Sequence, residues 1–400
     1  MIHKTRMMVS CSLACCLFMT AATPRETGQD GTSVERDGRT FAVRKDGMPP
    51  ITGGSFDPLL PTEGLAGWMV TGGDATIERK GDELHGQGNA GRNTFLMSED
   101  THGDFILEGE VRINKGGNSG WQVRSHQVRP GERTSGIRGY QIEVDSSDRS
   151  WSGGFYDELR RGWIHPFQDD EEARGAFKTD AWNHYRIECI GPHVRTWVNG
   201  VACADVIDFA DLEGLIAFQV HSGRCDVRWR NLRIRKLGRS TFAVVPSEER
   251  RITPEMPWVI PIEVDEKRGS HTLRIRYRLS GSGAVRIETG PDGTSCTVQL
   301  AEKGSDGDGR VSGLRSETSR YPIAATRGGT ERMPEDVREL IIDIEGPRLV
   351  VLVDGSIISR VRAETPIDVR KVTIEATGDD STLELIETSQ CRRTQPVTED

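Results

Sequence analysis

Two similar segments of alternating apolar and polar residues constrain this chain more than any other feature. The first, ending at Gly200, reads YRIECIGPHVRTWVNG, and the second, ending at Gly355, reads LIIDIEGPRLVVLVDG. Alternation with a period of two is typical of strands that bury one face. The Asn-Gly and Asp-Gly pairs that end the segments favour two-residue hairpin turns. Because the Gly-Pro pair also recurs at the same place, an internal repeat of antiparallel hairpins is predicted.

Other alternating runs extend this pattern along the chain. In the first half they predict strands over residues 105–113, 120–125, 140–145, 184–190, 194–199, 215–221 and 227–236. Further on, the run HTLRIRYRLSGSGAVRIETG resembles DFILEGEVRINKGGNSGWQVRS, and VRKVTIEATGDDSTLELIET resembles GLIAFQVHSGRCDVRWRNLRIR. Glycine is abundant, at 45 of 400 residues, and no long helical tract occurs. These features predict an all-β fold of two sandwiches that meet near Arg239, over residues 55–238 and 241–392. Only the polar stretch 156–178 is expected to hold a short helix or a long loop.

The N-terminal residues have the pattern of an export signal. Lys4 and Arg6 precede an apolar stretch over residues 7–18, and small residues follow it at 20–22. Residues 1–22 are therefore predicted to be a signal peptide, and the mature protein is expected to be periplasmic or extracellular. Cysteine 15 fits a lipid-anchor site only loosely, and no later run reaches the ~20 apolar residues of a membrane helix. Residues 23–54 lack periodicity and are predicted to be a linker or an irregular lead-in.

Charge and cysteine content exclude several classes of partner. The chain carries 52 basic and 61 acidic residues, a net charge of −9, which opposes nucleic acid as a partner because phosphate binding relies on a cationic surface. After signal cleavage the remaining cysteines are Cys189, Cys203, Cys225, Cys296 and Cys391. They form no CxxC pair, so neither a disulfide scaffold nor a zinc site is indicated. At most one or two disulfides are expected.

Three predicted strands each carry polar side chains on one face. These are Gln122 and Arg124 on the first, Gln141, Glu143 and Asp145 on the second, and Gln219 and His221 on the third. The sheet face that they form could simply meet water, because antiparallel sheets often leave one face solvated. However, the adjacent loop WSGGFYDELRRGW adds three further aromatic residues, and aromatic rings beside amides and carboxylates suit a pyranose. A sugar site on this face is therefore the favoured hypothesis.

Five motifs then resemble one family, in its order: GGNSGWQVRS, GYQIEVDSSDRSWSGGFYDELRRGW, AWNHYRIECIGPHVRTWVNG, GLIAFQVHSG and VRWRNLRIRKL. They span residues 56–237 and are similar to the 3-keto-disaccharide hydrolase domain family. The resemblance implies an exported protein with a concanavalin A-like jelly-roll fold, and the internal repeat then makes the second half a degenerate copy in tandem. It also implies cleavage of glycosides oxidised at carbon 3, by removal of the C2 proton, elimination of the C1 substituent and net hydrolysis.

That chemistry needs a base, a group that stabilises the enolate and an acid. The expected catalytic residues are His221 as base or acid, Glu143 and Asp145 as its partners or as metal ligands, and Arg124 near the enolate oxygen. The expected substrate-binding residues are Asn118, Gln122, Gln141, Trp151, Tyr156, Asp157, Glu158, Arg161, Trp163 and Gln219. A divalent metal could replace Arg124 as the electrophile, although no spacing demands one.

Two other classes of function stay open. A lectin-like module would use the same face to bind a sugar without proton chemistry. A conventional glucanase would need two carboxylates flanking the scissile bond. Strand parity further predicts that Arg124, Glu143, Asp145 and His221 converge on one pocket beside the loop 151–163.

Overall fold

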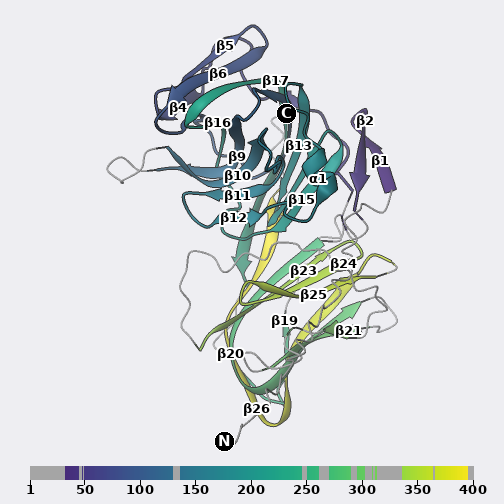
Figure 1. The fold of residues 1–400 in the computed structure, drawn as a ribbon. Coiled ribbons are helices and arrows are strands. Elements are labelled where there is room, and N and C mark those ends of the chain that lie inside the picture. Colours follow the sequence, from purple (N-terminus) through teal and green to yellow (C-terminus); the bar gives the residue numbers. More distant parts are fainter. Residues whose placement is uncertain are drawn as a thin grey trace, which may run out of the picture.

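The computed structural model describes residues 32–44, 47, 49–128, 136–245, 250–260, 270–289, 295–301, 309, 311–312, 336–363 and 365–394. The predicted signal peptide lies outside these residues. Strands make up almost all of the regular structure, and the one helix described, α1 (Glu171–Gly175), is short. Within the described residues no helix is long and apolar enough to cross a membrane. The predicted all-β sandwich fold is confirmed, and Figure 1 shows its strands gathered in an upper and a lower region.

The upper region, called the first region, consists of two facing sheets. One has the strand order β12-β11-β10-β9-β16-β7-β4, with bounds Gly162–His165, Phe155–Glu158, Ile137–Asp145, Asn118–Gln127, Leu215–Val220, Thr94–Ser98 and Trp68–Gly72. The other has the order β5-β6-β17-β8-β13-β14-β15, with bounds Thr76–Lys80, Glu83–Ala90, Gly223–Val244, Asp104–Ile113, Asn183–Ile190, His193–Val198 and Val201–Ile207. The short strand β3 (Asp57–Pro58) also pairs with β17.

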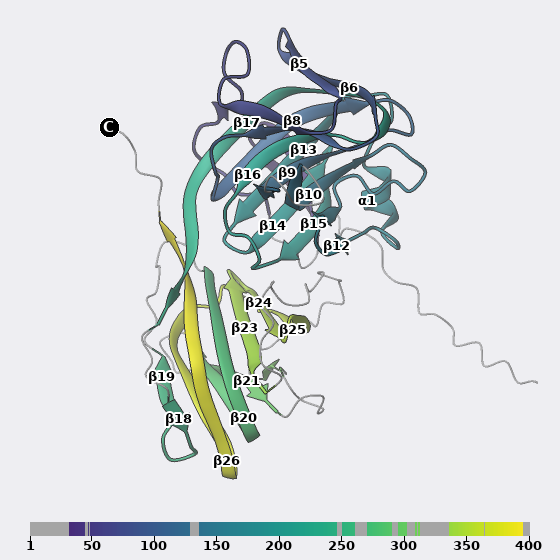
Figure 2. The ribbon, with the colours of Figure 1, turned by 90° about the vertical axis from the view of Figure 1, so that its left-hand side faces the viewer.

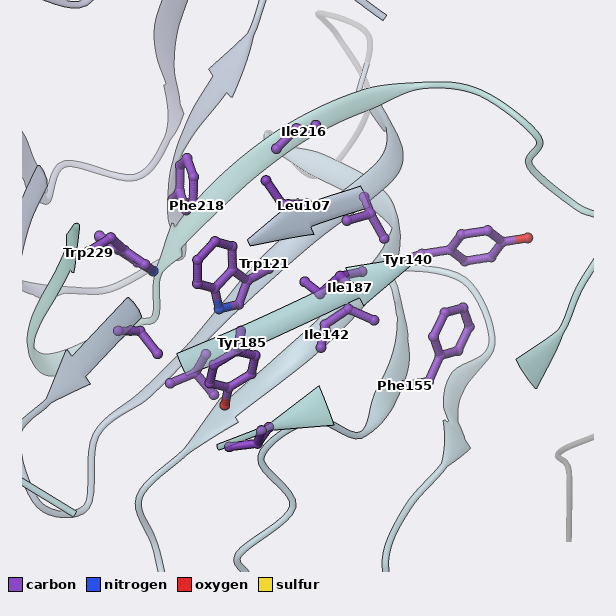
Figure 3. Close-up of a cluster of buried hydrophobic side chains, with 14 of the residues drawn as sticks. Leu107, Trp121, Tyr140, Ile142, Phe155, Tyr185, Ile187, Ile216, Phe218 and Trp229 are labelled. Atoms are coloured by element: carbon purple, nitrogen blue, oxygen red, sulfur yellow. The ribbon is translucent and has the colours of Figure 1, made fainter. Parts of the chain in front are cut away.

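The core of the first region lies between these sheets. Figure 3 shows Trp121, Phe218 and Tyr185 packed there, and the ring of Trp121 lies 5.3 Å from that of Phe218 and 5.6 Å from that of Tyr185. All three side chains are fully buried. Since side chains alternate across a strand, burying Trp121 and Phe218 turns Gln122 and Gln219 to the opposite, outer face of their sheet.

The lower region, called the second region, is organised around two long strands, β20 (Ser270–Thr289) and β26 (Val369–Thr394). One half of this ribbon joins the order β25-β24-β23-β20-β26-β18, whose other strands are Ser356–Arg362, Arg348–Val353, Arg338–Glu345 and Arg250–Ile252. The other half joins β22-β21-β20-β26-β19, whose other strands are Val311–Ser312, Ser295–Leu300 and Trp258–Ile260. Gly281 and Gly378, both with positive φ, lie where the ribbon turns between the halves.

Equivalent turns recur in the two regions. Asn199 and Asp354 both have positive φ, precede a glycine with positive φ, and accept a backbone hydrogen bond through a side-chain oxygen, from His184 and Glu339 respectively. The Gly-Pro turns match as well, because the Pro192 and Pro347 carbonyls each accept a 2.8 Å backbone hydrogen bond. The predicted Asn-Gly and Asp-Gly hairpin turns are thus confirmed.

The two regions share one strand instead of a linker. β17 pairs with β8 up to Gly238 and with β26 from Arg239 onward, and Figure 2 shows it running from the upper region into the lower. Buried ion pairs reinforce the junction: Arg348 to Asp205 at 2.6 Å, Arg195 to Glu345 at 2.6 Å, and His193 to Asp343 at 3.1 Å.

Three details differ from the sequence-based expectations or refine them. Part of the predicted linker forms a hairpin, β1 (Thr32–Arg36) with β2 (Arg39–Val43), whose Phe41 is buried against Trp197. Its turn is Asp37-Gly38, a favoured hairpin pair that the polar surroundings obscured. The polar stretch 156–178 holds most of β11, all of β12 and the helix α1. The five cysteines named above are free thiols.

Candidate functional site

The candidate site lies on the outer face of β9, β10 and β16. Backbone pairing aligns Gln122 of β9 with Gln141 of β10, and Gly120 with Glu143 on one side and Gln219 on the other. Gln219 and Glu143 therefore flank Gly120, which has no side chain. A Cβ atom at Gly120 would lie 2.4 Å from the Gln141 side chain, so only glycine leaves room for that amide.

These polar side chains are not solvated. Gln122 and Gln219 are fully buried, and Gln141 and Glu143 are exposed by only 3% and 2%. A sheet face that merely met water would leave such side chains accessible. Burial of this many polar groups costs free energy unless each is hydrogen-bonded, so the face is organised for more than solvation.

A chain of hydrogen bonds ends at the Glu143 carboxylate. The Ser125 hydroxyl donates to Gln122, the Gln122 amide donates to Gln141 at 2.6 Å, and the Gln141 amide donates to Glu143 Oε2 at 2.9 Å. Asn118 donates to Glu143 Oε1 at 2.5 Å. Burial nevertheless raises the pKa of Glu143 to about 7, because desolvation outweighs these hydrogen bonds and the charge of Arg149. A carboxyl group of this pKa can exchange protons at neutral pH.

Arg149 connects the carboxylates to the aromatic loop. Its guanidinium donates to Glu143 and to Asp145, both at 2.7 Å. The same group lies 5.1 Å from the ring centre of Trp151 and 4.9 Å from that of Trp163, within cation–π range. The loop 151–163 therefore lies near Glu143 and Asp145, as the sequence predicted. Arg149 itself was not singled out from the sequence, because it lies in an irregular turn where alternation gives no face.

Tyr156 and Glu158 extend the site on β11. Tyr156 pairs with Gln141, and its ring contacts that of Trp163 at 5.1 Å. Burial raises the pKa of Tyr156, and the charges of Glu158 and Glu143 raise it further, so the tyrosine lies near both carboxyls. Burial also raises the pKa of Glu158 to about 7, partly offset by a hydrogen bond with Asn93. Asn93, a second residue not found from the sequence, accepts the Ser222 backbone N–H beside His221.

His221 lies just beyond the end of β16. Its Nδ1 is 2.8 Å from the Ser222 carbonyl oxygen, which fixes the ring locally. Among the described contacts, none joins His221 to Glu143 or Asp145. The predicted partnership of this imidazole with the two carboxylates therefore remains a prediction. Strand parity places Glu143 and Asp145 on the same sheet face.

The prediction that Arg124 shares this face is wrong. Arg124 has a left-handed backbone (φ 47°) where the register between β9 and β16 shifts, and this bulge reverses the direction of its side chain. The guanidinium is fully buried and donates to the Gly103 carbonyl at 3.0 Å and to Asp104 at 3.0 Å. Asp104 belongs to the opposite sheet, so Arg124 joins the two sheets.

Asp157 and Arg161 also lie away from the site. Asp157 pairs with Tyr140 of the core, so it points to the opposite face from Tyr156 and Glu158. It is fully buried and binds Arg161 and Arg160, and Arg161 reaches Asp208 at 2.9 Å. These ion pairs attach the β11–β12 turn to the loop after β15. The prediction that Asp157 and Arg161 contact substrate on the shared face is therefore not supported by their positions.

Two further observations concern ligands. Within the described part of the chain, no three His, Cys, Asp or Glu side chains are grouped as metal ligands, so the suggested divalent metal has no evident ligand set there. Gln219, in contrast, is fully buried, and neither its amide nitrogen nor its oxygen has a hydrogen-bond partner among the residues that the structure describes.

Comparison with known proteins connects this site to one family. Residues 55–235 match the model of the 3-keto-alpha-glucoside-1,2-lyase-like domain. The match contains every strand that carries the site and stops before the second region. It confirms the resemblance found in the five motifs. No curated protein matches the chain significantly.

Solved structures with partial likeness were also found. A protein named "Putative glycosyl hydrolase" from Parabacteroides distasonis ATCC 8503 is 18% identical, with a TM-score of 0.34, over 46% of this chain and 100% of that one. The carbohydrate-binding module CBM66 from Bacillus subtilis is 17% identical, with a TM-score of 0.32, over 42% of this chain and 93% of that one. A Bacillus subtilis protein of unknown function with a galectin-like fold is 12% identical, with a TM-score of 0.33, over 42% and 89% of the two chains.

Proposed function

We propose that this chain, whose residues 55–235 belong to the 3-keto-alpha-glucoside-1,2-lyase-like domain family, is an exported enzyme that cleaves glycosides bearing a ketone at carbon 3. The observation that carries the proposal is Glu143: a buried carboxyl group with a pKa of about 7, surrounded by amides and aromatic rings, inside the matched domain. A ketone acidifies the neighbouring C2–H bond, and a base of this strength suits its removal at neutral pH.

Glu143 removes the C2 proton in the proposed reaction. Its electron pair on oxygen forms the new O–H bond, the C2–H pair becomes the C2–C3 double bond, and the carbonyl pair moves to the C3 oxygen. Collapse of this enolate restores the ketone and expels the C1 substituent with its bonding electrons, leaving a C1–C2 double bond. Addition of water to that bond gives net hydrolysis. The bonds from Gln141 and Asn118 keep the carboxylate oriented toward the sugar.

Glu158 donates the proton that the leaving oxygen requires. Its pKa of about 7 leaves a substantial fraction protonated at neutral pH. Its carboxyl group forms a hydrogen bond with the Asn93 side chain, which carries no charge. Glu143 differs in this respect, because Arg149 contacts it directly and favours its ionised form. Two carboxyls in different surroundings can therefore divide the base and acid roles.

The aromatic side chains bind the apolar faces of the sugar. Trp163 contacts both Trp151 and Tyr156, at 4.8 and 5.1 Å between ring centres, and all three are partly exposed beside the buried carboxylates. Such rings pack against the C–H faces of a pyranose. His221, just beyond the end of β16, contributes a further polar contact to the sugar. The second region supports the first without catalytic groups of its own.

The proposal is tested with two matched substrates. The purified protein is incubated with 4-nitrophenyl 3-keto-glucoside and with the unoxidised glucoside, and 4-nitrophenol release is followed with and without chelator. Turnover of the keto substrate alone, with loss of the C2 proton to solvent, is expected. Cleavage of the unoxidised glucoside at a similar rate would favour a conventional glycosidase, and binding of either sugar without turnover would favour a lectin-like module.

A further inference from the structure

We infer that Gln219 is the residue that stabilises the enolate, by donating its amide N–H to the C3 oxygen of the keto sugar. This inference rests on the proposed function and replaces the role that the sequence suggested for Arg124. It starts from the position of the side chain. Phe218 and Val220 point into the core, so Gln219 points to the outer face, across Gly120 from Glu143.

The spacing of these two residues suits the two reacting positions of the sugar. Gln219 and Glu143 lie on strands two apart, so their backbones are separated by ~10 Å, twice the spacing of neighbouring strands. Both side chains point the same way. Gly120 between them has no side chain, and the Gln141 amide lies over it while donating to Glu143. A pyranose ring that lies over Gln141 can present its C2–H to the carboxylate and its C3 oxygen to the Gln219 amide.

The hydrogen-bond capacity of Gln219 is unused in the absence of substrate. Both its Nε2 and its Oε1 are buried and without a hydrogen-bond partner in the described part of the chain. A buried amide without hydrogen bonds destabilises the free protein. A ligand that forms those hydrogen bonds removes this penalty, which favours binding. A carbonyl oxygen next to a hydroxyl matches this amide, because Nε2 donates to the former and Oε1 accepts from the latter.

The other donors near Glu143 are already committed. Asn118 and Arg149 both donate to Glu143 itself, and the Gln122 and Gln141 amides donate along the chain that ends there. Arg124 is bound to the opposite sheet. Among the side chains just named, Gln219 alone has both polar atoms free, and a fixed, uncommitted donor is what stabilises charge that develops only in the transition state.

The test compares Gln219→Met with the wild type on a 3-keto-glucoside. Methionine keeps the length of the side chain and removes the N–H donors, so kcat is expected to fall roughly 10²-fold while KM changes little. The melting temperature should not fall, since no hydrogen bond within the protein is lost. A second readout uses 3-keto-1,5-anhydroglucitol, which has no leaving group. Exchange of its C2 proton with D₂O should slow by a similar factor.

Thr388→Val is the matched control. Thr388 is also fully buried with an unpartnered hydroxyl, but it lies in β26 of the second region. Its substitution should leave kcat and the exchange rate unchanged. Turnover by Gln219→Met within twofold of the wild type would overturn the inference alone, as would a raised KM with unchanged kcat, because the amide would then bind substrate without stabilising the enolate. Absence of turnover by the wild type would overturn the proposed function, and this inference with it.

Discussion

The outer sheet faces of the two regions occupy equivalent places in the strand order but carry different side chains. In the first region Gln122 and Gln219 are fully buried beside Glu143. In the second, the neighbouring strands β20 and β26 carry Arg286 and Glu375, which form an ion pair at 3.1 Å with side chains exposed by 49% and 24%. Similar strand orders thus carry a buried polar cluster in one region and a partly exposed ion pair in the other, so the difference lies in the side chains and their burial and not in the backbone topology.

The strands themselves differ in continuity. β8 and β9 are separate strands in different sheets, and β16 ends at Val220 before β17 begins at Gly223. In the second region the corresponding segments stay continuous as β20 and β26. The breaks in the first region place Asn118 at the start of one strand and His221 at the end of another, on the side of the sheet that carries Asp145. Interrupting the strands therefore creates one end of the candidate site.

The largest expected effect comes from removing the buried carboxylate of the first region. Glu143→Gln should lower kcat/KM for a 3-keto-glucoside roughly 10³-fold, because the amide cannot accept the C2 proton. The matched variant Glu375→Gln, on the exposed face of the second region, should leave kcat/KM unchanged. Steady-state kinetics of both variants checks the comparison. Equal losses in the two variants would mean that the faces do not differ in function.

The second prediction concerns Arg124. Its substitution by methionine removes the cationic partner of the buried Asp104 and should lower the free energy of unfolding by about 3 kcal/mol. The kcat of the folded fraction should stay close to that of the wild type, because the guanidinium joins the two sheets on the side opposite the site. Denaturant unfolding and active-site titration measure the two quantities. A large loss of kcat with unchanged stability would mean that Arg124 is a catalytic residue after all.

The third prediction concerns how kcat/KM depends on pH, because burial raises the pKa values of Glu143 and Glu158 in the first region. Below pH 7 the base becomes protonated and above pH 7 the acid becomes ionised, so kcat/KM should peak near pH 7 and fall about tenfold per pH unit well away from the peak. Glu158→Gln should abolish the alkaline limb and keep the acidic one. A flat profile between pH 5 and 9 would contradict both assignments.

The same carboxyls affect stability. Because their folded pKa values exceed the ordinary value, the folded state binds more protons than the unfolded state between about pH 4.5 and 7, so their contribution to stability declines as pH rises through that window. The melting temperature of Glu143→Gln relative to wild type should therefore increase from pH 5 to pH 7.5.

The smallest effect is expected at Arg286. Its ion pair with Glu375 is partly exposed, and pairs of this kind contribute less than about 1 kcal/mol. Arg286→Ala should change the free energy of unfolding by no more than that and leave kcat unaltered, as thermal unfolding and kinetics can show. A loss as large as that of Arg124→Met would mean that the second face is as organised as the first.

Much of this architecture was predictable from alternation and turn chemistry. The strands around Glu143 and Gln219, their shared face and the Asn199-Gly200 turn follow from period-two patterns and a hairpin signal. Arg124 was misplaced because a single left-handed residue inserts a bulge that no alternation reveals. Arg149 and Asn93 were missed because loop residues have no periodicity to assign a face. The burial of Gln219 depends on residues distant in sequence, so its unused hydrogen-bond capacity becomes evident only in three dimensions.

The sharing of β17 by the two regions has a consequence for how the protein comes apart. Its 22 residues pair with β8 and β6 in one region and with β26 in the other, without a loop between. If either region unfolds, β17 loses part of its hydrogen-bonded neighbours, although the other region still contains this strand. The buried His193–Asp343 contact also makes each region depend on the other for stability. Heat should therefore unfold the regions in one cooperative calorimetric transition, and proteases should find no susceptible site between Gly238 and Val244.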